Sequence, residues 1–346
     1  MEIVATIGPL STNYSTIKSI IEAGANLLRF NFALGSTEEM IERVDVAKKV
    51  ISDHNYNNVK ILADLPGCKI RVCDFIEGKL HINKKNKYIF KSCFELTSCK
   101  EFIPINYPNI GKCVSLDQLL IIGDGEIVFC IEEIYNDESF TAVALNSGVL
   151  RALNGISISG EIDKLNHFTS NTINHIKSLD YLRPDFVAFS FVRDADMVIK
   201  GKELIQHSCG INYKPKIVSK IETPLGIENF ESIVGITDII LLARGDLAVY
   251  TDYSKLGIYQ TKAIDICKLH KKKIIISTQV LESLVDRYFP TRSEVSDLTN
   301  IVLKGAHGIM LCKETVLPSE PSHTIEVAKK IISQALLAQG NERFYI

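Results

Sequence analysis

Residues 216–246 read KIVSKIETPLGIENFESIVGITDIILLARGD, and this stretch holds two short apolar runs, Lys216–Lys220 and Asp238–Ala243. Both runs are rich in β-branched residues and stop beside small or charged residues, a pattern that predicts buried strands. Six more runs of this kind occur along the chain, at Ile3–Thr6, Asn26–Phe32, Lys60–Asp64, Phe186–Phe191, Lys273–Thr278 and Gly308–Leu311. Most of the runs precede a stretch that predicts an amphipathic helix, for example Tyr14–Glu22, Thr37–Asp53, Asp194–His207, Tyr253–Leu269 and Ser293–Leu303.

Strands that alternate with helices predict an α/β fold with a parallel sheet, because a helix must carry the chain back between parallel strands. Eight such strands suggest a sheet that closes into a (β/α)₈ barrel. Active sites of these barrels form at the C-terminal ends of the strands. The search for functional residues therefore starts at the strand ends.

One connection breaks the alternation, because the segment between Asp64 and Phe186 begins with short strands and turns. The predicted strands there are Lys79–Ile82, Lys87–Phe90, Glu126–Ile134 and Phe140–Leu145. We place a β-rich insertion, a candidate lid domain, at residues 70–157, after the third barrel strand. The barrel then comprises residues 1–69 and 158–346, and these 258 residues approach the ~250 that are typical of one barrel.

Composition excludes several classes of function. The chain carries 39 Lys and Arg against 41 Asp and Glu, so its net charge of −2 gives no basic field for nucleic acid or for an anionic membrane. No apolar stretch reaches the ~18 residues that span a bilayer, and we expect a cytoplasmic protein. Nine cysteines without a CxxC pair predict reduced, mostly buried thiols rather than disulfides or a zinc site.

Chemically useful side chains stand at the predicted strand ends: Arg29, Asn31, Asp64, Lys220, Glu222, Asp246 and Thr278. Glu222 and Asp246 are a pair of oxygen ligands suited to Mg²⁺, which takes one or two carboxylates and completes its shell with water and substrate oxygens. Lys220 and Arg29 supply positive charge for phosphate or enolate oxygens, and the backbone N–H groups of residues 243–246 offer a carboxylate site. Together these groups favour phosphoryl or enolate chemistry.

Each of these signals also has a simpler interpretation. A Lys-x-Glu pair is more often a surface ion pair, and an Asp before an apolar run is more often a helix cap. Their occurrence at several strand ends of one barrel favours an active site.

At these residues the sequence resembles the pyruvate kinase family. The matching motifs extend over almost the whole chain: Ala5-Thr6-Ile7-Gly8-Pro9, Arg29-Phe30-Asn31-Phe32, Ser190-Phe191-Val192-Arg193, Val218-Ser219-Lys220-Ile221-Glu222, Ala243-Arg244-Gly245-Asp246-Leu247, Thr278-Gln279-Val280-Leu281-Glu282-Ser283, Pro290-Thr291-Arg292-Ser293-Glu294 and Glu314-Thr315. The insertion matches more loosely, through Gly123-Asp124-Gly125 and Asn146-Ser147-Gly148.

The resemblance implies a role for each strand-end residue. Glu222 and Asp246 would hold Mg²⁺ or Mn²⁺, Lys220 would stabilise the transferring phosphoryl group, and Thr278 would lie beside the methylene carbon that is protonated. The resemblance also implies that Ala243, Gly245 and Asp246 bind the substrate carboxylate and that Asn31 and Asp64 bind a monovalent cation. Arg29 would contact the phosphoryl group, and Arg71, Arg29 and Pro9 would contact the nucleotide.

The chain also departs from the family pattern. Ala33-Leu34 stands where the family has Ser-His, which removes a potassium ligand and an imidazole near the nucleotide. Lys69 stands where potassium-dependent members have Glu, so we expect its ammonium to replace the monovalent cation and no K⁺ requirement. Leu153-Asn154-Gly155 replaces Lys-Lys-Gly, which removes a nucleotide-phosphate lysine, although Arg151 lies close in sequence.

Members of this family usually continue into a C-terminal allosteric domain. Only one predicted helix and a polar tail follow Thr315 in this sequence, so we expect that domain to be absent. The resemblance implies a small-molecule substrate, phosphoenolpyruvate or pyruvate with ADP or ATP, and it is compatible with a homodimer. Three functions stay open at this stage: phosphoryl transfer between phosphoenolpyruvate and ADP, an enolate reaction with another acceptor, and a non-catalytic binding or regulatory role.

Overall fold

The computed structural model describes residues 1–159 and 168–340. Within these residues the chain forms two compact units. The first contains residues 1–67, 168–245 and 256–340, and the second contains residues 68–159 and 246–255. No helix of the described part is long and apolar enough to cross a membrane.

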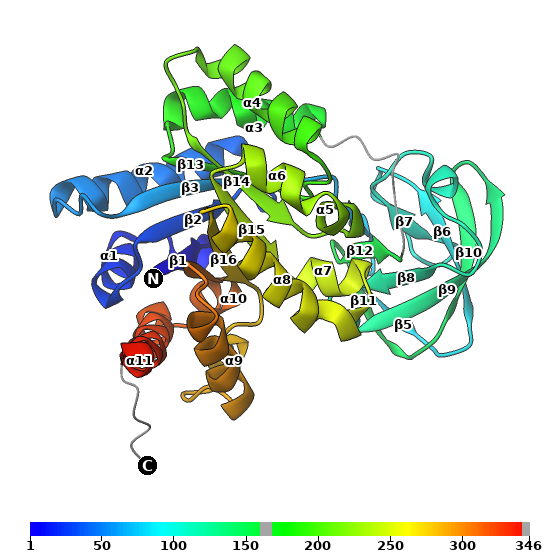
Figure 1. The fold of residues 1–346 in the computed structure, drawn as a ribbon. Helices are drawn as coiled ribbons and strands as arrows, with labels where there is room; N and C mark the ends of the chain where they lie inside the picture. The colour runs from blue at the N-terminus through cyan, green and yellow to red at the C-terminus, as the bar shows by residue number, and fades with distance from the viewer. Residues whose placement is uncertain (160–167, 341–346) are drawn as a thin grey trace. The chain divides into compact units, whose positions relative to one another are not determined.

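The first unit is a closed barrel of eight parallel strands (Figure 1). In order around the barrel the strands are β1 (Glu2–Ile7), β17 (Gly308–Leu311), β16 (Lys273–Ser277), β15 (Ile239–Ala243), β14 (Lys216–Ile221), β13 (Phe186–Phe189), β3 (Lys60–Leu65) and β2 (Leu27–Asn31). Neighbouring strands pair in parallel register, as in Asn31 opposite Asp64. The predicted (β/α)₈ barrel is confirmed, and each strand lies within two residues of its predicted bounds.

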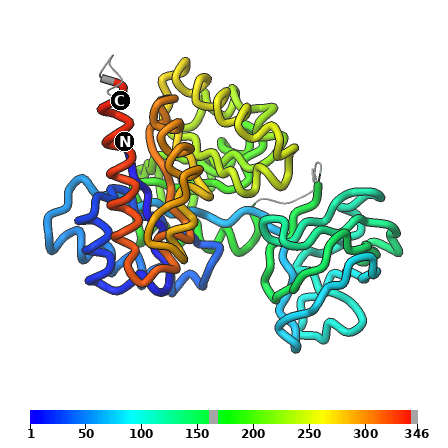
Figure 2. The backbone as a smooth tube through the Cα atoms, turned by 90° about the horizontal axis from the view of Figure 1, so that it is seen from below, coloured from blue at the N-terminus to red at the C-terminus, as the bar shows by residue number. Residues whose placement is uncertain are grey.

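Helices cover the outside of the barrel (Figure 1). They are α1 (Tyr14–Ala23), α2 (Thr37–Asp53), α3 (Ser170–Leu182), α4 (Ala195–Cys209), α5 (Pro224–Glu228), α6 (Phe230–Ile236), α8 (Leu256–Leu269), α9 (Arg292–Leu303), α10 (Lys313–Val316) and α11 (Pro321–Gly340). One more helix, α7 (Arg244–Tyr250), belongs mostly to the second unit. Short 3₁₀ turns lie at Pro9–Ser11, Ile110–Cys113, Tyr253–Lys255 and Glu282–Val285. The last long helix, α11, packs against α1 and α9 (Figure 2).

Local sequence explains where these helices begin. Ser36 caps α2 in a reciprocal capping box with Glu39, and Thr291 caps α9 in the same way with Glu294. Inside the barrel, one apolar side chain from each strand contributes to the core, including Val4, Leu27, Leu62, Ala188, Val218, Leu241, Ile275 and Met310. The barrel is therefore a packed core, and its polar groups gather at the strand ends.

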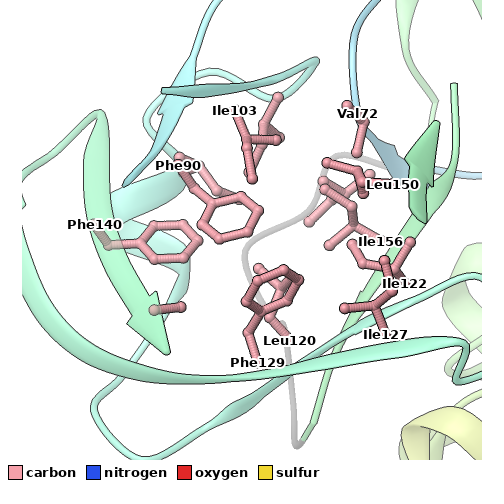
Figure 3. Packing of buried hydrophobic residues seen from close by; sticks show 14 of the residues in the cluster. Val72, Phe90, Ile103, Leu120, Ile122, Ile127, Phe129, Phe140, Leu150 and Ile156 are labelled. Carbon is pink, nitrogen blue, oxygen red and sulfur yellow. The ribbon is translucent and has the colours of Figure 1, made fainter. Parts of the chain in front are cut away.

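The second unit is rich in β-strands. Seven strands form one sheet in the order β4 (Ile70–Arg71), β12 (Gly155–Ile158), β8 (Leu119–Ile122), β9 (Ile127–Asn136), β10 (Ser139–Ala144), β6 (Lys87–Ser92) and β7 (Ile103–Ile105), and β5 (Lys79–Ile82) pairs with β11 (Gly148–Arg151). Phe90, Phe129 and Phe140 fill its core together with Ile and Leu side chains (Figure 3). The phenyl rings of Phe90 and Phe140 stack, and Phe129 meets Phe90 edge-on. This unit therefore has a hydrophobic core of its own.

All nine cysteines are reduced thiols, as predicted. The expectation that most are buried is wrong, because only Cys99, Cys209 and Cys267 are fully buried while the other six are partly exposed.

Candidate active site

Parallel strands place their C-terminal ends on one rim of the barrel, so side chains from distant parts of the sequence meet there. The rim of the first unit carries Arg29 and Asn31 from β2, Asp64 from β3, Ser190 after β13, Lys220 and Glu222 from the end of β14, and Thr278 after β16. Arg29, Asp64, Lys220, Glu222 and Ser190 are all less than 9% exposed. Charged groups are this deeply buried only when other groups compensate their charge.

Asp64 is the counterion of two buried cations. Its Oδ2 accepts a hydrogen bond from Arg29 Nε at 2.7 Å, and its Oδ1 lies 3.3 Å from Lys220 Nζ. Burial alone would raise the pKa of Asp64, but the charges of Lys220 and Arg29 lower it below its ordinary value. Asp64 therefore stays ionised and holds both cations in place.

Among the described residues, three acceptors contact the ammonium group of Lys220, which carries three protons. These acceptors are Ser190 Oγ at 2.8 Å, Glu222 Oε1 at 3.2 Å and Asp64 Oδ1 at 3.3 Å. The other carboxylate oxygen of Glu222 accepts the backbone N–H of Phe191 at 2.7 Å. Two carboxylates and two cations thus form one buried set without net charge.

The backbone around this set adopts unusual conformations. Phe191 has φ +55°, and Thr278 and Gln279 have φ +67° and +49°, which is the left-handed region. For a β-branched residue such as Thr278 this is an outlier that other contacts must enforce. Arg244 does so by donating hydrogen bonds to the carbonyl oxygens of Thr278 and Gln279 at 2.8 and 3.0 Å.

The same strained turn places the Thr278 hydroxyl. Its Oγ1 accepts the backbone N–H of Gly245 at 2.6 Å, so Thr278 is fixed against the end of β15. Ala243, the last residue of β15, is 3% exposed. The hydroxyl predicted to act in proton transfer is therefore held from both its backbone and its side chain.

In the second unit the predicted residues form a separate group. Lys69 Nζ donates to Asp246 Oδ1 at 2.7 Å, and Arg71 donates to the carbonyl oxygen of Leu153 at 3.1 Å. Burial lowers the pKa of Arg71, and the charge of Asp246 opposes this shift. The observed partner of Lys69 is thus a carboxylate that we predicted as a Mg²⁺ ligand.

A family model described as the barrel domain of pyruvate kinase matches residues 1–325 of this chain. The chain belongs to the pyruvate kinase family.

Individual relatives agree with this assignment. A pyruvate kinase of Thermotoga maritima is 30% identical over 335 residues, which cover 96% of this chain and 70% of the relative. A pyruvate kinase of Thermococcus litoralis is 31% identical over 330 residues, which cover 95% of this chain and 68% of the relative. Among solved structures, a pyruvate kinase from Cryptosporidium parvum superposes with a TM-score of 0.86 at 27% identity, covering 96% of this chain and 68% of that one.

Two rim residues of this pyruvate kinase homologue carried no predicted role. Ser190 contacts Lys220, although the only signal in the sequence was its place in the motif Ser190-Phe191-Val192-Arg193. Glu314 is 1% exposed and accepts the backbone N–H groups of Leu281 and Cys312, which ties the chain after β16 to the end of β17. Burial raises the pKa of Glu314, while these backbone hydrogen bonds act in the opposite direction.

The two carboxylates predicted to bind Mg²⁺ belong to different units, Glu222 to the first and Asp246 to the second. Within the described residues no group of three or more His, Cys, Asp or Glu side chains gathers, as a site made wholly of protein ligands would require. Mg²⁺ needs only one or two carboxylates, because water and substrate oxygens complete its shell. Glu222 and Asp246 each face a lysine ammonium within their own unit, so each already lies where a positive charge is stabilised.

The remaining predicted contacts stay predictions. The Asn31 side-chain oxygen accepts the backbone N–H of Ala33 at 3.1 Å, and Pro9 begins an exposed 3₁₀ turn. These observations do not show whether Asn31 binds a monovalent cation or whether Pro9 contacts a nucleotide.

Proposed function

We propose that this chain transfers a phosphoryl group between phosphoenolpyruvate and ADP. The observation that carries the proposal is the buried set in which Asp64 and Glu222 hold the Lys220 ammonium beside the Arg29 guanidinium. Cations fixed before the substrate arrives stabilise the charge of a transferring phosphoryl group without reorganisation during the reaction. This is the chemistry that a phosphotransferase needs most.

The proposed roles are those that the family resemblance implies for these positions. Lys220 and Arg29 would stabilise the phosphoryl oxygens, and the backbone of Ala243, Gly245 and Asp246 would bind the substrate carboxylate. Thr278, whose hydroxyl accepts the N–H of Gly245, would lie beside the methylene carbon that is protonated. Glu222 and Asp246 bind Mg²⁺ or Mn²⁺, which supplies positive charge to substrate oxygens when bound.

A coupled assay for pyruvate formation from phosphoenolpyruvate and ADP, in the presence of Mg²⁺, tests the proposal. We expect turnover in the wild type and its loss in Lys220→Met, which keeps the aliphatic chain but removes the charge. No pyruvate at high enzyme concentration would contradict ADP as the acceptor.

One observation favours a second candidate, an enolate reaction with an acceptor other than ADP. Arg71, the arginine predicted to hold nucleotide phosphates, donates to the carbonyl oxygen of Leu153 within its own unit. Leu153 stands in the segment that replaces the family's phosphate-binding lysines. Calorimetric binding of oxalate, an enolate mimic, with Mg²⁺ separates this candidate from a non-catalytic role, since a purely regulatory protein has no reason to bind it.

A further inference from the structure

The Ser190 hydroxyl lies inside the buried set of charges. Ser190 follows β13 directly and is 6% exposed. Its oxygen accepts a hydrogen bond from Lys220 Nζ at 2.8 Å, the shortest of the three contacts of that ammonium group. A hydroxyl oxygen has two lone pairs, and the direction of its O–H bond decides where they face. The orientation of the Ser190 hydroxyl therefore decides how well it accepts the hydrogen bond from Lys220.

The direction of this hydroxyl is fixed by the end of β3. The single Ser190 proton has two acceptors in reach, the Leu65 carbonyl oxygen at 2.8 Å and Asp64 Oδ1 at 3.2 Å. The shorter contact is the stronger hydrogen bond, so the O–H group points to Leu65. A lone pair of the oxygen then faces Lys220.

The backbone of Ser190 is held on both sides. A Cβ atom on Gly67 would lie 3.1 Å from Ser190 Cβ and 2.5 Å from Phe191 Cδ2, so only glycine allows the chain after β3 to pack this closely. On the other side, Phe191 keeps its left-handed conformation and donates its N–H to Glu222. Ser190 is thus a rigid link between the ends of β3, β13 and β14.

We propose that Ser190 is a positioning residue that orients the Lys220 ammonium for the phosphoryl group. When a substrate oxygen takes one of the three Lys220 protons, Ser190 and Asp64 retain the other two and keep the nitrogen in place. The proposal deepens the function proposed above, because it rests on the role of Lys220 in that reaction.

Kinetics of three variants test this role. Ser190→Ala removes the oxygen, and Ser190→Cys keeps the side-chain size but offers a sulfur that accepts hydrogen bonds weakly. Ser219→Ala is the matched control, because Ser219 is fully buried one residue before Lys220 and bonds to Thr237 instead. We expect kcat to fall about 10- to 100-fold in both Ser190 variants, as for a lost hydrogen bond to a charged group, with KM for phosphoenolpyruvate changed less than about threefold.

A second measurement does not depend on activity. A lysine ammonium with three fixed acceptors exchanges its protons slowly, so Lys220 should give a ¹⁵Nζ signal in NMR spectra of lysine-labelled protein, assigned by its loss in Lys220→Arg. We expect the signal to broaden or vanish in Ser190→Ala and to persist in Ser219→Ala.

The outcomes are distinguishable. Unchanged kcat in Ser190→Ala, kcat retained in Ser190→Cys, or an equal loss in Ser219→Ala would each overturn the positioning role. If the wild type does not turn over phosphoenolpyruvate with ADP, the proposed function fails, and the ammonium signal alone decides: its persistence in Ser190→Ala refutes the role of Ser190.

Discussion

Replacing Asp64 by Asn tests whether this carboxylate holds the buried cations together. The substitution keeps the side-chain shape and removes one negative charge that is 1% exposed and contacts both Arg29 and Lys220. Removing one partner of a buried ion pair costs about 3–5 kcal/mol, because the remaining charge is left uncompensated. Here Arg29 loses its carboxylate partner while Lys220 keeps Glu222, so we expect a loss of unfolding free energy within this range.

Equilibrium unfolding in guanidinium chloride, followed by circular dichroism at pH 7, measures the loss. Asp185→Asn is the matched control, since Asp185 pairs with Lys60 at 3.5 Å but its side chain is 40% exposed, and such pairs contribute about 0–1 kcal/mol. A loss in Asp64→Asn no larger than in Asp185→Asn would refute the counterion role.

The same variant has a defined dependence on pH. The pKa of Asp64 is lower in the folded protein than in the unfolded chain, where it is about 3.9. Its contribution to stability is therefore fully present above that value and is lost as pH falls through the folded pKa. We expect the difference between wild type and Asp64→Asn to be constant from pH 6 to 8 and to shrink below about pH 4.

Three further predictions concern the site and its surroundings. Because Lys69 stands where potassium-dependent members of the family have Glu, turnover should not rise steeply with K⁺ when Na⁺ and choline salts keep the ionic strength constant, and a steep rise would contradict this expectation. Thr278→Ala should slow exchange of the methyl protons of pyruvate with solvent while Mn²⁺ binding, followed by electron paramagnetic resonance, stays near wild type; an unchanged exchange rate would exclude Thr278 from proton transfer. Burial raises the pKa of Cys99 and Cys267 to about 12, so peptide mass spectrometry should show both alkylated by iodoacetamide more slowly at pH 7.5 than the partly exposed Cys130, and equal rates would count against buried thiols.

The eight barrel strands were predictable because each is a short β-branched run bounded by small or charged residues, whereas five short strands of the second unit were not named: β4, β7, β8, β11 and β12. Two of the errors at strand ends have one physical cause. Phe191 and Thr278 were predicted as strand residues, but each has a left-handed backbone that tertiary contacts enforce, and these contacts cannot be read from neighbouring residues. Helix α3 was missed because its sequence is largely polar, and α5, α6 and α10 were missed because they are short.

The identities of the rim residues were also predictable, whereas their partners were not. The sequence places Asp64, Lys220 and Glu222 at strand ends, but only the barrel register shows that Asp64 serves two cations at once. The pairing of Lys69 with Asp246 joins residues that are 177 positions apart, and no local pattern indicates it. Ser190 and Glu314 hold other groups in place through hydrogen bonds, and a serine or a glutamate in the sequence does not by itself indicate such partners.

The charge balance of the rim explains why the proposed reaction needs a divalent cation. Asp64 and Glu222 offset Arg29 and Lys220, so the buried set is neutral before any ligand binds. A phosphate ester with a carboxylate brings several negative charges into this set, and desolvated charge is costly unless it is compensated. If Glu222 were to bind a divalent cation, the Lys220 N–H that it accepts would become available to a phosphoryl oxygen, while Asp64 and Ser190 would still accept the other two. The positive charge of the metal would offset the negative charge of the substrate, so we expect each to strengthen the binding of the other. Asp64, rather than Glu222, would then be the carboxylate that holds Arg29 and Lys220 both with and without ligands.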